Sequence, residues 1–224
     1  MIFFSPHEGP ALVCPICQKR KAKRFCPAKG ETICSVCCGT EREVSIDCPS
    51  DCPFLASSRE YDWARQEREF DWSKLPFPDV KIAPSFANER ASLLSAISYA
   101  IVAYARDNRP LVDDDVMASL QALAEAYRTL TSGLYYEKPP DYPYQRRLYE
   151  ALKAALEEYK KAEAPRLAVS GPRDSDIRDA LIFFTQLGAR HNNGRPKGRA
   201  YLDLLRSQFP AEEFSRPESK IVLP

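Results

Sequence analysis

The stretch CPICQKRKAKRFCPAKGETICSVCCGTEREVSIDCPSDC, residues 14–52, contains all 8 cysteines of the 224-residue chain. Two Cys-x-x-Cys pairs stand out within it, Cys14 with Cys17 and Cys34 with Cys37. A two-residue spacer lets both sulfurs of a pair reach one tetrahedral metal ion, so these pairs together predict a first four-cysteine zinc site. The remaining cysteines are enough for a second zinc site: Cys26, Cys38, Cys48 and Cys52.

The order of the cysteines predicts that the two zinc sites interleave. Cys26 falls between the two pairs, and the adjacent Cys37 and Cys38 are easier to place on two metal ions than on one. Other partitions of the cysteines stay open. Structural zinc contributes about 10–16 kcal/mol of apparent binding free energy to folding. Such a contribution explains how a segment this short folds without a large apolar core.

The cysteine spacing across residues 14–52 resembles that of a B-box or a HIT-type zinc finger. Both families interleave two zinc sites and serve as protein-interaction modules, so the resemblance implies two zinc ions and a protein partner. These families place a further ligand about three residues after the position of Cys26, where this chain has Lys29, and Cys38 is the candidate replacement. Their last ligands often include histidine, whereas this chain has a final pair of cysteines.

Three other uses of clustered cysteines are a disulfide framework, an iron–sulfur cluster and a redox dithiol. Residues 1–6 carry neither a basic segment nor a long apolar one, so we expect no secretory signal and a cytoplasmic location. In a reducing compartment, clustered cysteines more often bind metal than form disulfides. No run of about 18 or more apolar residues predicts a membrane span, and we expect no membrane partner.

Beyond residue 85 the apolar residues follow the 3.6-residue period of helices. Five amphipathic segments with short links predict an antiparallel helical bundle, with Asp113 and Asp141 as candidate caps for the second and third helices. The expected core stripes are Leu93/Ile97/Ile101/Tyr104, Val116/Leu120/Leu123/Tyr127/Leu130, Leu148/Leu152/Leu156/Tyr159, Ile177/Leu181/Phe184 and Tyr201/Leu204/Leu205/Phe209.

The fold class is therefore mainly α, with a small Cys-rich zinc-binding module followed by the antiparallel bundle. The expected organisation is a double-zinc module at 1–55, a short helix and Pro-rich linker at 56–84, a helical bundle at 85–210 and a loose tail at 211–224.

Charge is balanced over the whole chain, with 32 Lys and Arg against 31 Asp and Glu, so no global field favours nucleic acid. Two local loops are basic, at 19–24 and 190–199. They either bind nucleic acid or have local roles, as counter-charges to zinc thiolates and as cations at a helix C-terminus. Candidate nucleic-acid contacts are Lys19, Arg20, Lys21, Lys23, Arg24, Arg195, Lys197 and Arg199.

Catalytic signatures are missing from the sequence. There is no Gly-rich phosphate loop, and the chain has only 2 histidines. We therefore expect a non-enzymatic interaction or adaptor protein whose partner is another protein, with the oligomeric state left open. The alternatives are a nucleic-acid-binding regulator that uses the two basic loops, and a thiol-based metal or redox sensor that loses zinc on oxidation.

Overall fold

A computed structural model describes residues 13–164 and 172–210, with the side chains of Gln66 and Glu67 excepted. The start of the predicted module and the predicted tail at 211–224 lie outside the described residues. The elements are β1 (Arg24–Cys26), β2 (Glu31–Ile33), α1 (Ser35–Glu41), α2 (Pro53–Glu69), the 3-10 helix η1 (Trp72–Lys74), α3 (Phe86–Glu89), α4 (Ala91–Asp107), α5 (Asp113–Thr131), α6 (Pro143–Glu163), α7 (Asp174–His191) and α8 (Ala200–Arg206).

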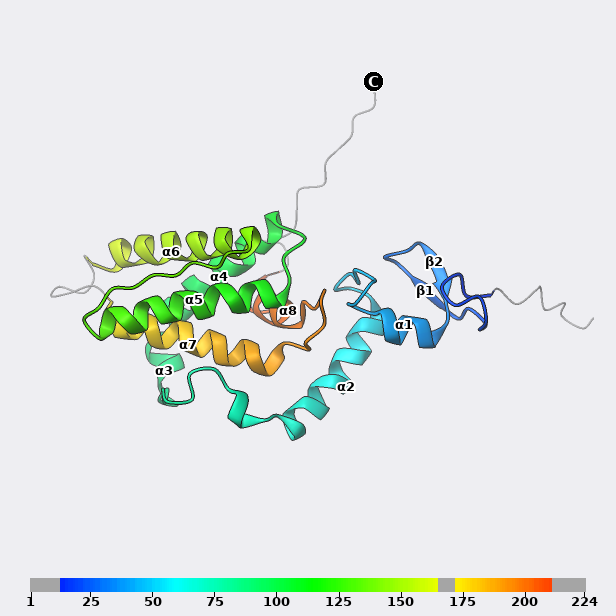
Figure 1. Cartoon of the computed structure of the whole chain (residues 1–224), viewed down its shortest axis with the longest axis horizontal. Coiled ribbons are helices and arrows are strands. Elements are labelled where there is room, and N and C mark those ends of the chain that lie inside the picture. Colours follow the sequence, from blue (N-terminus) through cyan, green and yellow to red (C-terminus); the bar gives the residue numbers. More distant parts are fainter. Residues whose placement is uncertain (1–12, 165–171, 211–224) are drawn as a thin grey trace, which may run out of the picture.

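The predicted mainly α fold, with a Cys-rich segment ahead of the helices, is confirmed, whereas the predicted antiparallel arrangement is wrong for α5 and α6. Among the described residues, the strands are confined to one antiparallel hairpin, β1–β2, in the Cys-rich segment, and helices make up most of the rest. Figure 1 shows the hairpin and α1 at one end of the molecule and the bundle of α4 to α8 at the other, with α2 between them. No helix in the described part of the chain is both long and apolar enough to cross a membrane.

The bundle core is built from the apolar stripes of α4 to α8. Leu120, Leu148 and Ile177 are all fully buried in it, as the 3.6-residue period predicts. Helices α5 and α7 pack closely where α7 has Gly188. A Cβ atom at Gly188 would lie 2.1 Å from the Met117 sulfur and 2.8 Å from the Tyr201 ring, so only glycine fits there.

Helices α5 and α6 run in the same direction, although short links favour antiparallel neighbours. Residues 132–142 cross back along the bundle between them. An extended segment of this length spans about 35 Å, whereas α5 is about 28 Å long, so the crossing is long enough. The two helix starts are therefore neighbours, and Gln145 Nε2 donates a hydrogen bond to Asp115 over 3.1 Å. At the other end, the Lys160 ammonium lies over the Tyr127 ring.

The crossing segment is anchored by Glu137. Its carboxylate accepts hydrogen bonds from the Tyr149 hydroxyl (2.6 Å) and the Lys153 ammonium (2.7 Å). Partial burial alone would raise the pKa of Glu137, but bonds from Lys153, Tyr135 and Tyr149 lower it to about 2. The carboxylate therefore stays charged through the physiological range and holds the crossing against α6.

Two predicted helix caps are wrong in detail. Helix α6 begins at Pro143 with Tyr142 as its N-cap, and Asp141 lies outside the helix. Proline is favoured at this first position because its missing N–H has no partner in the first turn. Asp113 is the first residue of α5, and its buried carboxylate accepts from the backbone N–H groups of Tyr201 and Leu202, each at 3.0 Å. Asp113 therefore caps α8 rather than its own helix.

The segment between the cysteines and the bundle is docked along most of its length. Helix α2 starts at Pro53, within the range predicted for the module, and its Trp63 ring stacks on His191 of α7 at 4.0 Å. Further on, Phe77 packs against the bundle core, and Gln186 donates hydrogen bonds to the carbonyls of Pro76 and Phe77. The proline-rich linker thus follows the bundle surface.

The Cys-rich module contacts the connection between α7 and α8, and Glu43 lies at the centre of this contact. Its side chain is 2% exposed and accepts from Arg59 and from Asn193, both at 2.8 Å. Its carbonyl accepts from the Lys197 backbone N–H at 2.8 Å. Glu43 has a φ of 53°, which costs on the order of 1 kcal/mol for a residue with a Cβ. These partners stabilise that strained conformation.

Replacing Glu43 is expected to loosen this contact. In Glu43→Gln the half-buried Arg59 and Asn193 lose their anionic acceptor, and losing charge-assisted hydrogen bonds of this kind costs about 1–3 kcal/mol. Amide hydrogen exchange should then be faster at Lys197, whose N–H is bonded to Glu43. Glu31→Gln removes the same charge from an exposed position of the module and should leave this exchange rate unchanged. Equal protection of the Lys197 amide from hydrogen exchange in both variants would contradict the role given to Glu43 at this contact.

Candidate metal centre

The first Cys-x-x-Cys pair lies on a tight turn. Residues Val13 and Lys21 form a β-bridge that closes the turn, and Cys14 N donates to the Arg20 carbonyl over 2.8 Å. Gln18 N donates to the Cys14 carbonyl, and Gln18 adopts a left-handed φ of 51°. This backbone path bends the chain so that the sulfurs of Cys14 and Cys17 face the same side.

The second pair lies at the start of α1, directly after strand β2. Cys34 is the N-cap of α1, and its sulfur accepts a hydrogen bond from the Cys37 backbone N–H at 3.3 Å. Positions three apart lie on one side of a helix, so both sulfurs face the first pair. The bond also places a backbone N–H, and the positive end of the helix, next to a sulfur that becomes a thiolate when metal binds.

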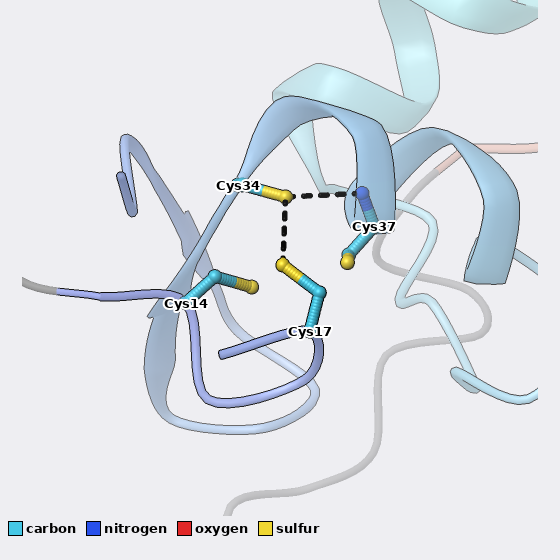
Figure 2. A group of neighbouring side chains, drawn as sticks. All are labelled: Cys14, Cys17, Cys34 and Cys37. Carbon is cyan, nitrogen blue, oxygen red and sulfur yellow. Dashed lines mark hydrogen bonds between the residues drawn. The ribbon is translucent and has the colours of Figure 1, made fainter. Parts of the chain in front are cut away.

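All four sulfurs converge on one point, as Figure 2 shows. The sulfurs of Cys14, Cys17, Cys34 and Cys37 lie within 4.8 Å of one another, and this group can hold a metal ion. The distance between the Cys17 and Cys34 sulfurs is 3.9 Å. A tetrahedral ion with zinc–sulfur bonds of about 2.3 Å separates its ligands by about 3.8 Å. The cysteines are free thiols, and their spacing fits a tetrahedral ion such as zinc.

The pKa values of the thiols differ within the four-cysteine group. Hydrogen bonding to the Lys19 backbone, opposed by burial, lowers the pKa of Cys17 to about 6. Burial and the neighbouring cysteines raise the pKa of Cys37 to about 12. Several buried thiols at one point resist simultaneous ionisation, and a divalent cation supplies the charge that stabilises them together. Four sulfur ligands fill a tetrahedral shell, so the group resembles a closed structural site rather than a catalytic one.

The remaining cysteines line one small cavity but do not form a second ligand cluster. The cavity measures about 10 Å³, enough for a single water-sized particle. Within the described part of the chain, only the first group meets the 4.8 Å spacing. The guanidinium groups of Arg24 and Arg42 approach the Cys38 sulfur at 3.8 and 3.9 Å. The lining cysteines are Cys26, Cys38, Cys48 and Cys52.

The two basic loops have different environments. In the first loop, Lys19, Arg20, Lys21 and Lys23 are exposed, whereas Arg24 lies over the Phe54 ring at 4.8 Å and faces Cys38. Nucleic-acid binding by this loop stays a prediction.

The second loop faces the Cys-rich module. Arg195 donates to the Arg42 carbonyl over 2.6 Å, and Lys197 donates to the Ser45 carbonyl over 2.7 Å. Arg199 pairs with Asp47 and also donates to the Leu111 carbonyl. These side chains therefore connect the bundle to the module, and their part in nucleic-acid binding also stays a prediction.

Sequence reasoning missed the residues that join the cysteines to the rest of the chain. Glu43, Arg42 and Asp203 carry no motif, and nothing in a local pattern indicates which distant residue each contacts. The one available signal is compositional, because several charged residues stand between Cys38 and Cys48 in a segment that must pack tightly.

Comparisons of the chain with known protein families, curated proteins and solved structures find no match. The likeness to a B-box or a HIT-type zinc finger therefore rests on the cysteine spacing alone. What can be said of the class of protein comes from the structure. The chain combines a four-cysteine group that can hold a metal ion with a docked helical bundle.

Cobalt substitution tests which cysteines share the first ion. Co²⁺ in a tetrahedral thiolate site gives intense visible absorption and thiolate charge-transfer bands. We expect the first equivalent of Co²⁺ to give this spectrum in the wild type and in Cys38→Ser. Cys37→Ser should bind the first equivalent more weakly and with altered charge-transfer bands, because one of the converging sulfurs is removed and any remaining tetrahedral spectrum then comes from the proposed second group. The reverse result, in which Cys38→Ser loses the wild-type spectrum and Cys37→Ser retains it, would show that the cysteines are divided differently between the metal ions.

Proposed function

We propose that this chain is a non-enzymatic, zinc-dependent interaction protein, in which a double-zinc module docked on a helical bundle presents a binding surface to another protein. The convergence of the Cys14, Cys17, Cys34 and Cys37 sulfurs is the observation that carries the proposal. Such a closed ligand set leaves no coordination position for a substrate, so the metal serves folding.

A second zinc ion is part of the proposal. Four cysteines line the same small cavity, and Arg24 and Arg42 face one of them. A four-thiolate zinc centre carries a charge of −2, which nearby guanidinium groups offset. Metal binding couples to folding, so in this proposal the second ion draws these four sulfurs together as it binds.

The proposed interaction surface lies on the free side of the module. Val13 is 58% exposed and Phe25 is 59% exposed, on either side of the basic loop 19–23. Exposed apolar side chains next to positive charge suit a partner segment that is both apolar and acidic. The metal-bound framework would hold this surface rigid, which reduces the entropy lost on binding.

Nucleic-acid binding is the second candidate, and one observation favours it. The exposed Phe25 ring lies two residues after Lys23, the last exposed cation of the first basic loop. Cations that contact phosphates together with an aromatic ring that stacks on bases are the elements of single-strand recognition. The second basic loop adds little to this candidate, because Arg195, Lys197 and Arg199 contact the module.

A pull-down with surface variants separates the two candidates. The wild type should recover a specific protein, and the double variant Lys21→Glu with Phe25→Ser should lose it, because both the charge and the apolar contact are removed. Lys161→Glu on α6 is the matched control, since this lysine side chain is 69% exposed and lies on the bundle. Recovery should survive nuclease treatment. Equal recovery by the double variant would refute the surface, and loss on nuclease treatment would favour the nucleic-acid candidate.

A further inference from the structure

The second basic loop, residues 190–199, turns three of its cations toward the Cys-rich module (Figure 1). Arg195 and Lys197 each donate a hydrogen bond to a backbone carbonyl of the module, over 2.6 and 2.7 Å. Arg199 pairs with the carboxylate of Asp47. All three side chains are half-buried in this docked arrangement. The docked module therefore covers one face of the loop, and we name it the covered cation face.

Two of the three cations on the covered cation face contact dipoles rather than charges. Among the residues that the structure describes, neither Arg195 nor Lys197 is assigned an ion pair. A carbonyl oxygen carries only a partial negative charge, so a phosphate oxygen is a stronger partner for either cation. Residues 190–199 contain four Lys and Arg side chains and no acidic one. A loop that loses the module therefore has a positive charge that suits an anion.

The contact between the module and the bundle is polar, and polar contacts of this kind exchange with solvent. The buried apolar side chains of the bundle and of the module form two separate clusters. Each hydrogen bond between the two parts contributes little net free energy, because water replaces it when the parts separate. Relative motion is the default expectation for two units joined by a polar interface. A partner that binds the loop more strongly can therefore displace the module.

Arg59 of α2 holds the two parts together. Its guanidinium group pairs with Glu43 of the module at 2.8 Å and with Asp203 of α8, and its side chain is 19% exposed. One cation thus lies between a carboxylate of the module and a carboxylate of the bundle. Without this cation the two like charges remain near each other, and their repulsion favours separation.

We propose that the docked module covers a nucleic-acid-binding face of the second basic loop, and that separation of the module exposes this face to the phosphate backbone of a single strand. Nucleic acid suits the face better than an acidic protein does, because residues 192–199 offer no large apolar side chain for a protein to bury. A face that is covered in most molecules binds with an affinity reduced by the covered fraction. Changes that loosen the docking therefore strengthen binding. This inference does not depend on the protein partner proposed for the free side of the module.

Arg59→Gln tests the proposal, because it lowers the positive charge of the protein and yet should strengthen nucleic-acid binding. Fluorescence anisotropy of a labelled oligothymidine, titrated with full-length, metal-loaded protein, measures the affinity. We expect Arg59→Gln to bind about tenfold more tightly than the wild type, since a larger fraction of molecules has the face exposed. Arg65→Gln removes the same charge from an exposed position of α2 and should bind no more tightly than the wild type.

Glu43→Gln is a second way to loosen the docking, and it keeps the proposal testable if Arg59→Gln does not fold. Its matched control is Glu31→Gln, which makes the same change of charge at an exposed position of the module. Glu43→Gln should bind the oligothymidine several-fold more tightly than Glu31→Gln. Circular dichroism and zinc content show whether each variant is folded and loaded with metal.

A double variant identifies the face that binds. Adding Lys197→Gln to Arg59→Gln should remove the gain in affinity, because one cation of the covered cation face is lost. Adding Lys21→Gln, in the first basic loop, should preserve the gain. Unchanged or weaker binding by folded Arg59→Gln, or a gain that survives Lys197→Gln, would overturn the proposal. It would also be overturned if Arg59→Gln gained affinity for polyglutamate but not for oligothymidine.

Discussion

Four sulfurs within 4.8 Å of one another, three of them on buried cysteines, are the constraint on which the Cys-rich segment depends. Its own apolar core is small, since among the described residues this cluster has only Ile33 and Ile46 as buried members besides the cysteines. So few apolar contacts cannot offset the conformational entropy of ordering the segment. A metal ion can, because it joins the turn at Cys14 and Cys17 to the start of α1. Once the position of α1 is set, the backbone carbonyls and the carboxylate side chains of the residues after α1 face the bundle.

The bundle and the module are joined by polar contacts rather than by a shared core. Glu43 receives hydrogen bonds from α2 and from the connection between α7 and α8, so one side chain joins three parts of the chain. Arg195 and Lys197 add bonds to backbone carbonyls of the module. Polar contacts of this kind are specific in geometry and depend on each partner being in place. The four-cysteine group and the docked interface are consequently connected through α1 and the residues after it.

The sequence indicated the parts of the structure that depend on local spacing. The two Cys-x-x-Cys pairs predicted the ligand group, and stripes such as Leu93/Ile97/Ile101 predicted buried helix faces. The 3.6-residue hydrophobic period indicates which face of a helix is buried, but not the direction in which the helix runs in the bundle. The parallel arrangement of α5 and α6 was therefore not predictable. The partners of Asp113, Glu43 and Arg199 lie far away in sequence, and no local pattern specifies such contacts. For the same reason the cleft between segment 47–50 and the helices α4 and α8 emerges only when these parts are placed together.

Metal content per chain, measured by elemental analysis and native mass spectrometry on protein purified without added metal, tests the account most directly. The account predicts two zinc ions in the wild type and loss of one in Cys17→Ser. A single zinc in the wild type that Cys17→Ser removes would keep the first site and exclude the second. Protein that is folded without metal, or that contains iron in place of zinc, would contradict the central claim that zinc bound by Cys14, Cys17, Cys34 and Cys37 holds the module together.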